Sequence, residues 1–289
     1  MLVAETAHAG ANGDSPLVVS IRGFVARVTL NRPERSNALD RALLLALKGA
    51  LSGLRRSPGV RVVVLSGAGK SFCSGVDISE EGRREFYKAP QQIERLYQEN
   101  GQEVVRGLQF LPQVTIAEVN GPAIGWGTCL ATACDFRVVS AEAFFRIPEI
   151  GLGMYYDVGC LYGLLSLVGP AQAKRMTMTG DDIGAAEALS MGLADRVVSP
   201  ADLSAETLRL ATSLGVRDSA ALRIVKRQMC AATAAAKRHL GLMELELTTA
   251  YYGSNSDGIE GLAARKEARS PVFARESEDI GSGRKRNRK

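Results

Sequence analysis

Short apolar runs alternate with glycine turns and helix-like patterns over most of the chain. Runs of apolar and β-branched residues bounded by turn residues are typical of strands. We expect strands at residues 17–21, 24–30, 62–65, 113–119, 136–140, 143–146 and 195–198. Leu- and Ala-rich stretches between them predict helices, the first of which follows a cap at Asn37 or Asp40 and ends near Leu54. This alternation predicts one mixed α/β domain.

The pattern changes after residue 198, where helices replace strands. Apolar periodicity predicts helices at residues 200–214, 219–229, 235–249 and 258–268. The charged segment 80–111 has a first half typical of a mobile, pocket-lining stretch and a second half typical of a helix. We divide the chain into a flexible leader (1–15), a core (16–200), a helical C-terminal region (201–277) and a basic disordered tail (278–289).

Composition favours a sizeable folded core without a strongly charged body. Hydrophobic residues make up 46% of the 289 residues, and no apolar run reaches the ~18 residues needed to span a bilayer. The net charge of +5 resides in the last six residues, which carry five positive charges, so residues 1–283 are neutral overall. A basic tail this short gives only nonspecific, salt-sensitive attraction to nucleic acid. We expect binding neither to membranes nor to nucleic acid.

The cysteines and histidines limit which metal sites and which acid–base catalysis the chain can support. The five cysteines form no CxxC pair and no metal-ligand spacing, which predicts reduced thiols, a cytoplasmic location and no metal site. The two histidines, His8 and His239, lie in the leader and in a predicted helix. A Ser-His-Asp triad or a histidine-rich metal site is therefore excluded, and acid–base chemistry falls to carboxylates, cysteine, tyrosine or lysine.

Two glycine-rich stretches carry the candidate chemistry. Residues 120–136, NGPAIGWGTCLATACDF, read as a turn between a strand and an apolar helix. Such a turn aims backbone N–H groups of a helix N-terminus into a cleft, although glycine there also allows simple close packing. Residues 62–79, VVVLSGAGKSFCSGVDIS, contain GAGKS, but Val64 stands where a phosphate-binding loop needs its first glycine. We therefore reject nucleotide phosphate binding.

Taken together, FCSGVD followed about fifty residues later by NGPAIGWG resembles the crotonase (enoyl-CoA hydratase/isomerase) superfamily. Further matching segments follow in the family's order: LNRPERSNALD at 30–40, PEIGLG at 148–153 and TGDDIGAAEALSMGLADRVV at 179–198. The resemblance implies a spiral of ββα units with a helical C-terminal extension. It also implies a coenzyme A thioester substrate, no separate cofactor, and a homotrimer or dimer of trimers held together by region 201–277.

The resemblance implies particular binding residues. The N–H groups of Val76 and Trp126 correspond to the pair that holds the thioester carbonyl, where they stabilise an enolate. Trp126 departs from the family, in which glycine is usual. Asp77 also reads as an ordinary loop cap. The residues that correspond to coenzyme A contacts are Arg35, Ser36, Ser74, Asp77 and Ile78.

The acidic positions suggest the reaction. Hydratases of this family use two glutamates; here the first position holds Cys129 and the second holds Glu149. A buried thiol stays protonated and is a poor substitute for a carboxylate. Asp157, eight residues after Glu149, resembles the dienoyl-CoA isomerase branch, in which two carboxylates flank the acyl chain. The first position is usually aspartate in that branch, so Cys129 departs from its pattern as well. Asp157 also fits a helix N-cap.

Three functional hypotheses follow. The leading one is a proton-shuttling isomerase of unsaturated acyl-CoA that uses Glu149 and Asp157. The second is a hydratase, lyase or decarboxylase that uses Glu149 alone. The third is a non-catalytic protein with the crotonase fold that binds RNA through its basic tail.

Overall fold

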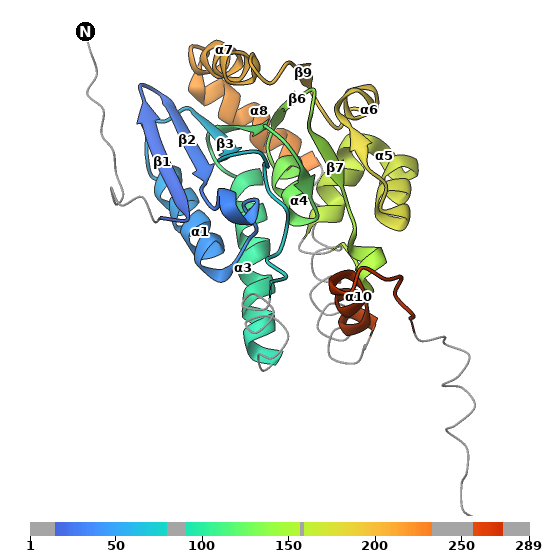
Figure 1. Ribbon diagram of the computed structural model, residues 1–289. Helices are drawn as coiled ribbons and strands as arrows, with labels where there is room; N and C mark the ends of the chain where they lie inside the picture. Colours follow the sequence, from blue (N-terminus) through green and yellow to red (C-terminus); the bar gives the residue numbers. More distant parts are fainter. Residues whose placement is uncertain (1–14, 80–90, 157–158, 233–256, 274–289) are drawn as a thin grey trace, which may run out of the picture.

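The computed structural model describes residues 15–79, 91–156, 159–232 and 257–273 (Figure 1). The predicted leader, the predicted helix at 235–249 and the basic tail lie outside these residues, as does Asp157. No described helix is both long and apolar enough to cross a membrane.

A six-stranded sheet forms the centre of the molecule. Its order is β1-β2-β3-β4-β6-β9; the β1–β2 pair is antiparallel and the remaining pairs are parallel. β3 and β4 are buried over nearly their whole length, as continuous apolar strands in the middle of a parallel sheet are. The strands are β1 (Leu17–Arg22), β2 (Val25–Leu30), β3 (Val62–Gly67), β4 (Val114–Val119), β6 (Phe136–Ser140) and β9 (Arg196–Val198).

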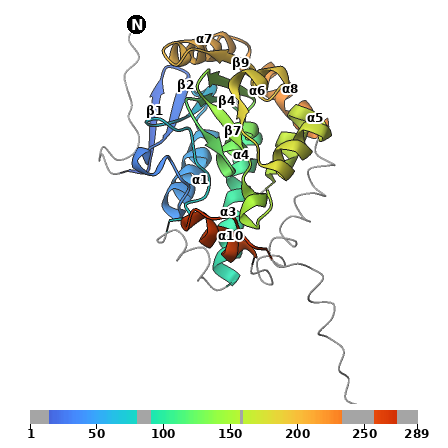
Figure 2. The same cartoon turned by 45° about the vertical axis from the view of Figure 1, so that its right-hand side comes forward.

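Helices cover both faces of this sheet. Successive strand residues point to opposite faces, and β3 carries apolar side chains on both, so each face has its own core. Val63 and Leu65 of β3 belong to one core. This core also contains the buried leucines of α1 (Arg41–Arg55) and the apolar residues in the second half of α3 (Gln91–Gln109). Val62 and Val64 belong to a second core beneath α7 (Leu203–Gly215). Figures 1 and 2 show α7 on one side of the sheet and α1 with α3 on the other.

A smaller sheet and several helices complete the fold. Its strands β5 (Ala123–Ile124), β7 (Phe144–Arg146) and β8 (Ile183–Gly184) lie beside α4 (Trp126–Ala133), all of whose residues are buried. The other elements are the short helices η1 (Pro33–Arg35), η2 (Glu149–Leu152) and α6 (Ala185–Ser190), and the longer helices α5 (Cys160–Thr179), α8 (Ser219–Ala232) and α10 (Asp257–Lys266).

The elements confirm most of the expected pattern. The seven predicted strands all occur, with two additional two-residue strands. Asp40, and not Asn37, caps α1: its Oδ1 accepts a hydrogen bond from Leu43 N at 2.8 Å. α5 is interrupted at Gly169, whose φ of 71° and ψ of 173° are not helical, so it consists of two helical segments joined at a kink.

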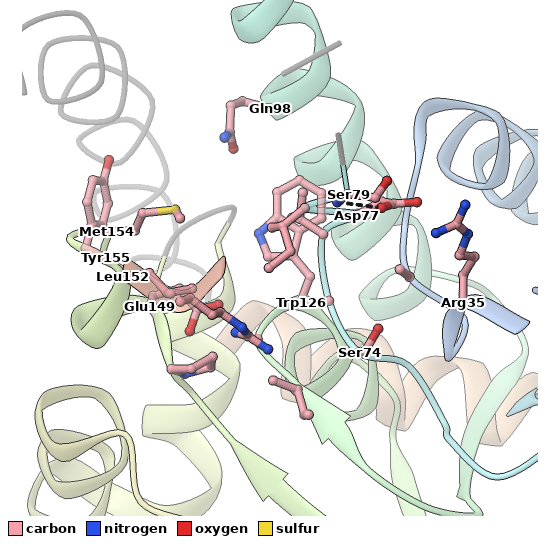
Figure 3. Close-up of a pocket in the computed structure, with 18 residues that line it drawn as sticks. Arg35, Ser74, Asp77, Ser79, Gln98, Trp126, Glu149, Leu152, Met154 and Tyr155 are labelled. Atoms are coloured by element: carbon pink, nitrogen blue, oxygen red, sulfur yellow. Dashed lines mark hydrogen bonds between the residues drawn. The ribbon is translucent and has the colours of Figure 1, made fainter. Parts of the chain in front are cut away.

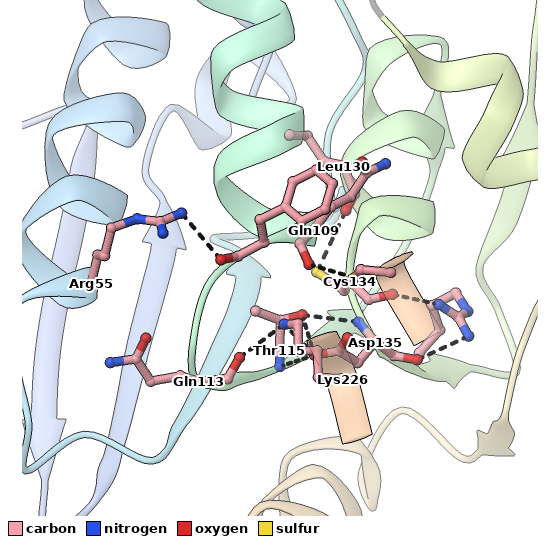
Figure 4. A network of polar contacts seen from close by, with 11 residues as sticks. Arg55, Gln109, Gln113, Thr115, Leu130, Cys134, Asp135 and Lys226 are labelled. Carbon is pink, nitrogen blue, oxygen red and sulfur yellow. Dashed lines mark hydrogen bonds and ion pairs between the residues drawn. The ribbon is translucent and has the colours of Figure 1, made fainter. Parts of the chain in front are cut away.

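α8 is fastened to the sheet by a polar cluster around Asp135 (Figure 4). Oδ2 of Asp135 accepts hydrogen bonds from Thr115 N and Oγ1 at 2.8 and 3.0 Å, and from Lys226 Nζ at 2.6 Å. Lys226 also donates to the carbonyl of Gln113 at 2.9 Å. The Lys226 side chain is only 9% exposed, so this contact holds α8 against β4 and against the end of α4.

The expectation that all five thiols are reduced was wrong for one pair. A disulfide joins Cys129 on α4 to Cys160 at the start of α5, with a Cα–Cα separation of 5.0 Å. The two cysteines are 31 residues apart, so their spacing gave no sign of a contact that the packing of α4 on α5 creates. Cys73, Cys134 and Cys230, all within the described residues, are not disulfide-bonded.

Candidate active site

A pocket of about 230 Å³ opens at the carboxyl edge of β3 and β4 (Figure 3). This is the edge at which open parallel sheets usually bind ligands. The loop after β3, the start of α4, η2, α3 and α10 all contribute to its wall. The lining residues are Arg35, Ala38, Ser74, Gly75, Val76, Asp77, Ile78, Ser79, Gln98, Ile124, Gly125, Trp126, Pro148, Glu149, Leu152, Met154, Tyr155 and Arg265.

Asn37 links the loops that follow β2 and β3. It is fully buried, and its Nδ2 donates to the carbonyls of Ala68 and Ser71 at 2.9 and 2.8 Å. Its Oδ1 accepts from Arg32 N at 2.9 Å. Buried amide groups need such partners, so Asn37 fixes the loop that carries Arg35 and Ser36 to the loop that carries Ser74 to Ile78.

Val76 is oriented by a short parallel bridge to Leu39. Leu39 N donates to the carbonyl of Gly75 at 2.7 Å, and Asp77 N donates to the carbonyl of Leu39 at 3.0 Å. In a parallel ladder the residue between those two groups points its own N–H to the opposite side. The N–H of Val76 therefore faces away from Leu39, and Val76 itself lines the pocket.

Glycine brings the two glycine-rich stretches into contact. Gly75 has φ 89°, and a Cβ added there would lie 2.8 Å from the carbonyl oxygen of Ile124 and 3.5 Å from Trp126 N. Only glycine permits this approach. Val76 and Trp126, which are fifty residues apart in the sequence, consequently line one pocket.

Trp126 is the first residue of α4 and follows the N-cap Gly125. N–H groups in the first turn of a helix are not used by the helix itself. The Trp126 side chain is 6% exposed and forms part of the pocket wall, as Figure 3 shows. Trp126 thus both lines the pocket, as expected for an indole that shapes its wall, and packs in the main core.

The Glu149 carboxylate lies against the backbone of Gly125. Gly125 has φ 54°, and a Cβ added to it would lie 2.5 Å from Oε1 of Glu149. Glu149 begins η2 directly after Pro148, and η2 is closed by a hydrogen bond from Met154 N to the carbonyl of Glu149 at 2.9 Å. The carboxylate is therefore held one residue away from Trp126. Asp157 lies outside the described residues, so the structure gives no distance from it to Glu149.

Asp77 lines the pocket, but both oxygens of its carboxylate accept hydrogen bonds from other residues of the protein. Oδ2 accepts from Arg32 Nη1 at 3.0 Å and Oδ1 from Ser79 N at 3.0 Å. Burial raises the pKa of Asp77, but the hydrogen bonds from Ser79 and the charge of Arg32 outweigh burial, so its pKa is lowered. Asp77 thus acts as an ionised loop anchor, which agrees with the cap alternative.

The other residues expected to contact coenzyme A divide into two groups. Arg35, Ser74 and Ile78 line the pocket. Ser36 is not among the lining residues; it has φ 52°, and its carbonyl accepts a hydrogen bond from Ser74 N at 3.0 Å. Ser36 therefore shapes the loop through its backbone.

None of the free buried thiols is suited to proton transfer. Burial raises the pKa of Cys73 and of Cys134 to about 12, so both thiols stay protonated at neutral pH. Cys129, at the position of the missing hydratase glutamate, is 1% exposed and bonded to Cys160. Among the described residues, no group of three His, Cys, Asp or Glu side chains is arranged to hold a metal ion.

Several pocket residues escaped the sequence-based prediction. α10 packs closely on η2: a Cβ at Gly153 would lie 2.5 Å from the carbonyl carbon of Asp257. This packing brings Arg265 to the pocket, and nothing in the local pattern around Arg265 indicates it. Gln98 comes from the second half of the charged segment, whereas the first half was expected to line the pocket and lies mostly outside the described residues.

Comparisons with known proteins identify the family of the chain. Residues 20–276 match the family model described as enoyl-CoA hydratase/isomerase. A probable enoyl-CoA hydratase of Mycobacterium bovis is 36% identical over 273 residues, which cover 89% of this chain and 92% of that protein.

Solved structures give the same result for the fold. An enoyl-CoA hydratase from Mycobacterium avium subsp. paratuberculosis has a TM-score of 0.81 at 28% identity, covering 90% of this chain and 99% of that one. A monofunctional enoyl-CoA isomerase from M. smegmatis has a TM-score of 0.63 at 33% identity, with 77% and 95% covered. These matches confirm the crotonase fold, and the chain belongs to the enoyl-CoA hydratase/isomerase family, whose members process acyl-CoA thioesters.

Proposed function

We propose that the protein is an isomerase that moves a double bond along the acyl chain of an unsaturated acyl-CoA, with Glu149 as its base. One observation carries this proposal: the Glu149 carboxylate lies beside Gly125, one residue before Trp126. A base in that place is next to the carbon adjoining a thioester carbonyl bound at the N–H of Trp126. Proton removal from that carbon is the first step of a double-bond shift.

The N–H groups of Val76 and Trp126 supply the stabilisation that this step requires. When Glu149 takes the proton, the electron pair of the C–H bond moves toward the carbonyl and makes an enolate. Two fixed backbone donors aimed at that oxygen lower the barrier, each by roughly 3 kcal/mol in comparable sites. Backbone donors accept any side chain, which explains how valine and tryptophan can serve here.

The second half of the reaction returns a proton to a carbon farther along the chain. The electron pair moves back from the enolate through the former double bond, and that distal carbon takes the proton. No oxidant, metal or cofactor is needed. In the dienoyl form of the reaction Asp157 acts as the acid at the distal carbon; with a simple enoyl chain Glu149 performs both transfers.

Asp77 is not a candidate for the base. Its carboxylate is bound by Arg32 and Ser79, and its lowered pKa makes it a still weaker proton acceptor. Of the two carboxylates among the described lining residues, Glu149 is thus the one suited to proton transfer.

The second candidate function is hydration of an enoyl-CoA, which the names of similar proteins favour. Hydration is best served by two carboxylates that hold one water between them. Cys129 fills the first of those positions, and its sulfur is bonded to Cys160. This favours isomerisation over hydration.

A product assay decides between these functions. We expect the purified protein to convert a 3-enoyl-CoA or a dienoyl-CoA to an isomer of unchanged mass, with a shift in ultraviolet absorbance. Glu149→Gln should reduce turnover by about 10²- to 10⁴-fold while thioester binding persists. A product that has gained the mass of one water establishes a hydratase instead, and full activity of Glu149→Gln refutes Glu149 as the base.

We further propose that the enzyme works without a separate cofactor, in the cytoplasm, as a homotrimer or a dimer of trimers. Family membership supports these proposals. The RNA-binding alternative depends on tail residues outside the described part of the chain. It is tested by comparing RNA retention by the full chain and by a chain that ends at residue 283.

A further inference from the structure

Gln98 places a neutral polar group inside the pocket. It projects from α3 and is 4% exposed, although it lines the cavity. Figure 3 shows its amide directed into the pocket, well separated from Glu149. No hydrogen bond joins this amide to another residue that the structure describes.

Buried side-chain polar groups nearly always have hydrogen-bond partners, and the Gln98 amide, which still reaches the cavity, has room for a partner there. Other parts of the pocket wall, formed by Trp126, Leu152 and Met154, are largely carbon. Water can satisfy the amide while the pocket is empty. An all-carbon acyl chain expels that water and leaves the amide without a partner, which is unfavourable.

We propose that Gln98 binds a hydroxyl group carried by the acyl chain of the substrate. A carboxamide offers both N–H donors and an acceptor oxygen, and a hydroxyl group both accepts and donates a hydrogen bond. The carboxamide and the hydroxyl group can therefore satisfy each other's hydrogen bonds, and neither needs to be charged. This inference rests on the proposed function only in that the pocket binds an acyl-CoA.

The position of Gln98 places the hydroxyl group away from the reacting carbons. Glu149 and the N–H of Trp126 lie at one end of the pocket, and the Gln98 amide lies at another (Figure 3). The hydroxyl group accordingly belongs to the distal part of the chain. A carboxylate at that place is better served by a cation such as the exposed Arg265, which also lines the pocket.

Gln102 provides a matched control. It lies one helical turn after Gln98 on α3 and is 8% exposed, but it is not among the residues that line the pocket. Replacing either glutamine by leucine removes one amide from the same helix and keeps a side chain of similar size. Only the change at Gln98 alters the pocket.

The test measures binding of saturated acyl-CoA thioesters by calorimetry, so that it does not depend on turnover. The probes are an unsubstituted chain, chains of equal length with a hydroxyl group at successive distal carbons, and a chain that ends in a carboxylate. We expect one hydroxylated chain to bind the wild-type protein about 10-fold or more tightly than the unsubstituted chain. Gln98→Leu should abolish this preference or reverse it, and Gln102→Leu should keep it.

The proposal is overturned if the wild type binds all chains equally, or if it prefers the carboxylate chain. It is also overturned if Gln98→Leu keeps the preference, or if Gln102→Leu removes it to the same extent. Binding without discrimination refutes the role of Gln98 alone. A hydroxyl preference in a protein that isomerises no thioester refutes the isomerase alone, and absence of binding to any thioester refutes both.

Discussion

At the scale of single residues, two glycines decide how the site is built. Gly75 allows the loop after β3 to approach Ile124, and Gly125 leaves the space that the Glu149 carboxylate occupies. Both have positive φ, which strongly favours glycine. The chemistry proposed for Glu149 therefore depends on residues that carry no functional group.

Gly125→Ala tests this dependence. A methyl group at position 125 meets Oε1 of Glu149 and sits on a backbone that alanine rarely adopts, so the carboxylate must move. A displacement of about 1 Å can lower turnover by about 10²-fold. The measurement is kcat and KM together with thermal stability.

The matched control is Gly151→Ala in the same short helix as Glu149, because a Cβ at Gly151 meets no atom within 4 Å. It should keep near wild-type activity. Equal losses in the two variants would show that the loop is merely sensitive to substitution.

Asp157→Asn addresses the second carboxylate. If Asp157 donates the proton at the distal carbon, the variant should lose isomerisation of a dienoyl-CoA by about 10²-fold or more. It should still exchange the proton next to the thioester with deuterated water, since Glu149 performs that exchange. Full isomerase activity, or a loss confined to thermal stability, would identify Asp157 as a helix cap.

At the scale of elements, loops around the pocket are joined by a few polar residues. Arg32 binds the carbonyl of Ala38 at 2.6 Å and the carboxylates of Asp77 and Asp40 at 3.0 and 3.2 Å. It thereby connects the loop after β2, the cap of α1 and the loop after β3. Because Asp77 adjoins Val76, the contact between Arg32 and Asp77 also restrains the backbone of Val76.

Asp77 makes the stability of this junction depend on pH. Its pKa is lowered in the folded protein, so its contribution is present above its ordinary value of 3.8 and is lost as pH falls through the lowered value. Asp77→Asn should reduce the free energy of unfolding at neutral pH, and the difference from wild type should shrink below pH 3.8. Denaturant unfolding at a series of pH values measures this.

Gly151→Ala, which removes no titratable group and whose added Cβ meets no atom within 4 Å, is the control and should differ from wild type by the same amount at every pH. A constant difference between Asp77→Asn and wild type across the acid range would contradict the assignment.

The disulfide between α4 and α5 carries the next prediction. It closes a loop with a sequence separation of 31 residues, and a crosslink of that span typically stabilises a protein by about 2–4 kcal/mol. Addition of a reductant should therefore lower the free energy of unfolding by about that amount. Cys129→Ala with Cys160→Ala should be equally destabilised and insensitive to reductant.

Cys230→Ala is the control, because Cys230 is not part of the disulfide, and it should respond to reductant as wild type does. Free thiols at both Cys129 and Cys160 in mass spectra of the non-reduced protein would contradict the prediction.

The sequence predicted elements better than contacts between elements. β3 and β4 followed from unbroken apolar runs, and the start of α1 followed from its acidic cap. These features depend on neighbours within a few residues. The Cys129–Cys160 bond and the contribution of Gln98 to the pocket depend on how distant helices pack, which no local pattern encodes.

The candidate site divides in the same way. The family resemblance assigned the two glycine motifs, with Val76 and Trp126, and the acidic position of Glu149 to one site, and all three residues line one pocket. The sequence did not distinguish Asp77 as an anchor from Asp77 as a binding group. That distinction requires Arg32, which lies 45 residues earlier in the chain.

At the scale of the whole molecule, residues 1–283 have no net charge, but their charges are unevenly distributed. A second cavity, at the amino edge of β3 and β4, is bordered by five arginines. None of them forms an ion pair with a described carboxylate at 4.0 Å or less. Summed charge therefore says little about local fields. The arginines are Arg55, Arg56, Arg61, Arg217 and Arg223.

Assembly is the last prediction. α8 has no buried residue, and its Ile224 and Val225 are more than half exposed. Apolar side chains on a helix that is fastened to the sheet by Lys226 are suited to burial against another subunit, and closed symmetric assemblies achieve this. Light scattering should give three or six times the chain mass of 30.8 kDa. Ile224→Glu should shift the protein toward smaller species, whereas Thr212→Glu, which adds the same charge at an exposed position of α7, should not. A wild-type protein that scatters as a single chain at micromolar concentration contradicts the prediction, and Ile224 is then an ordinary exposed residue.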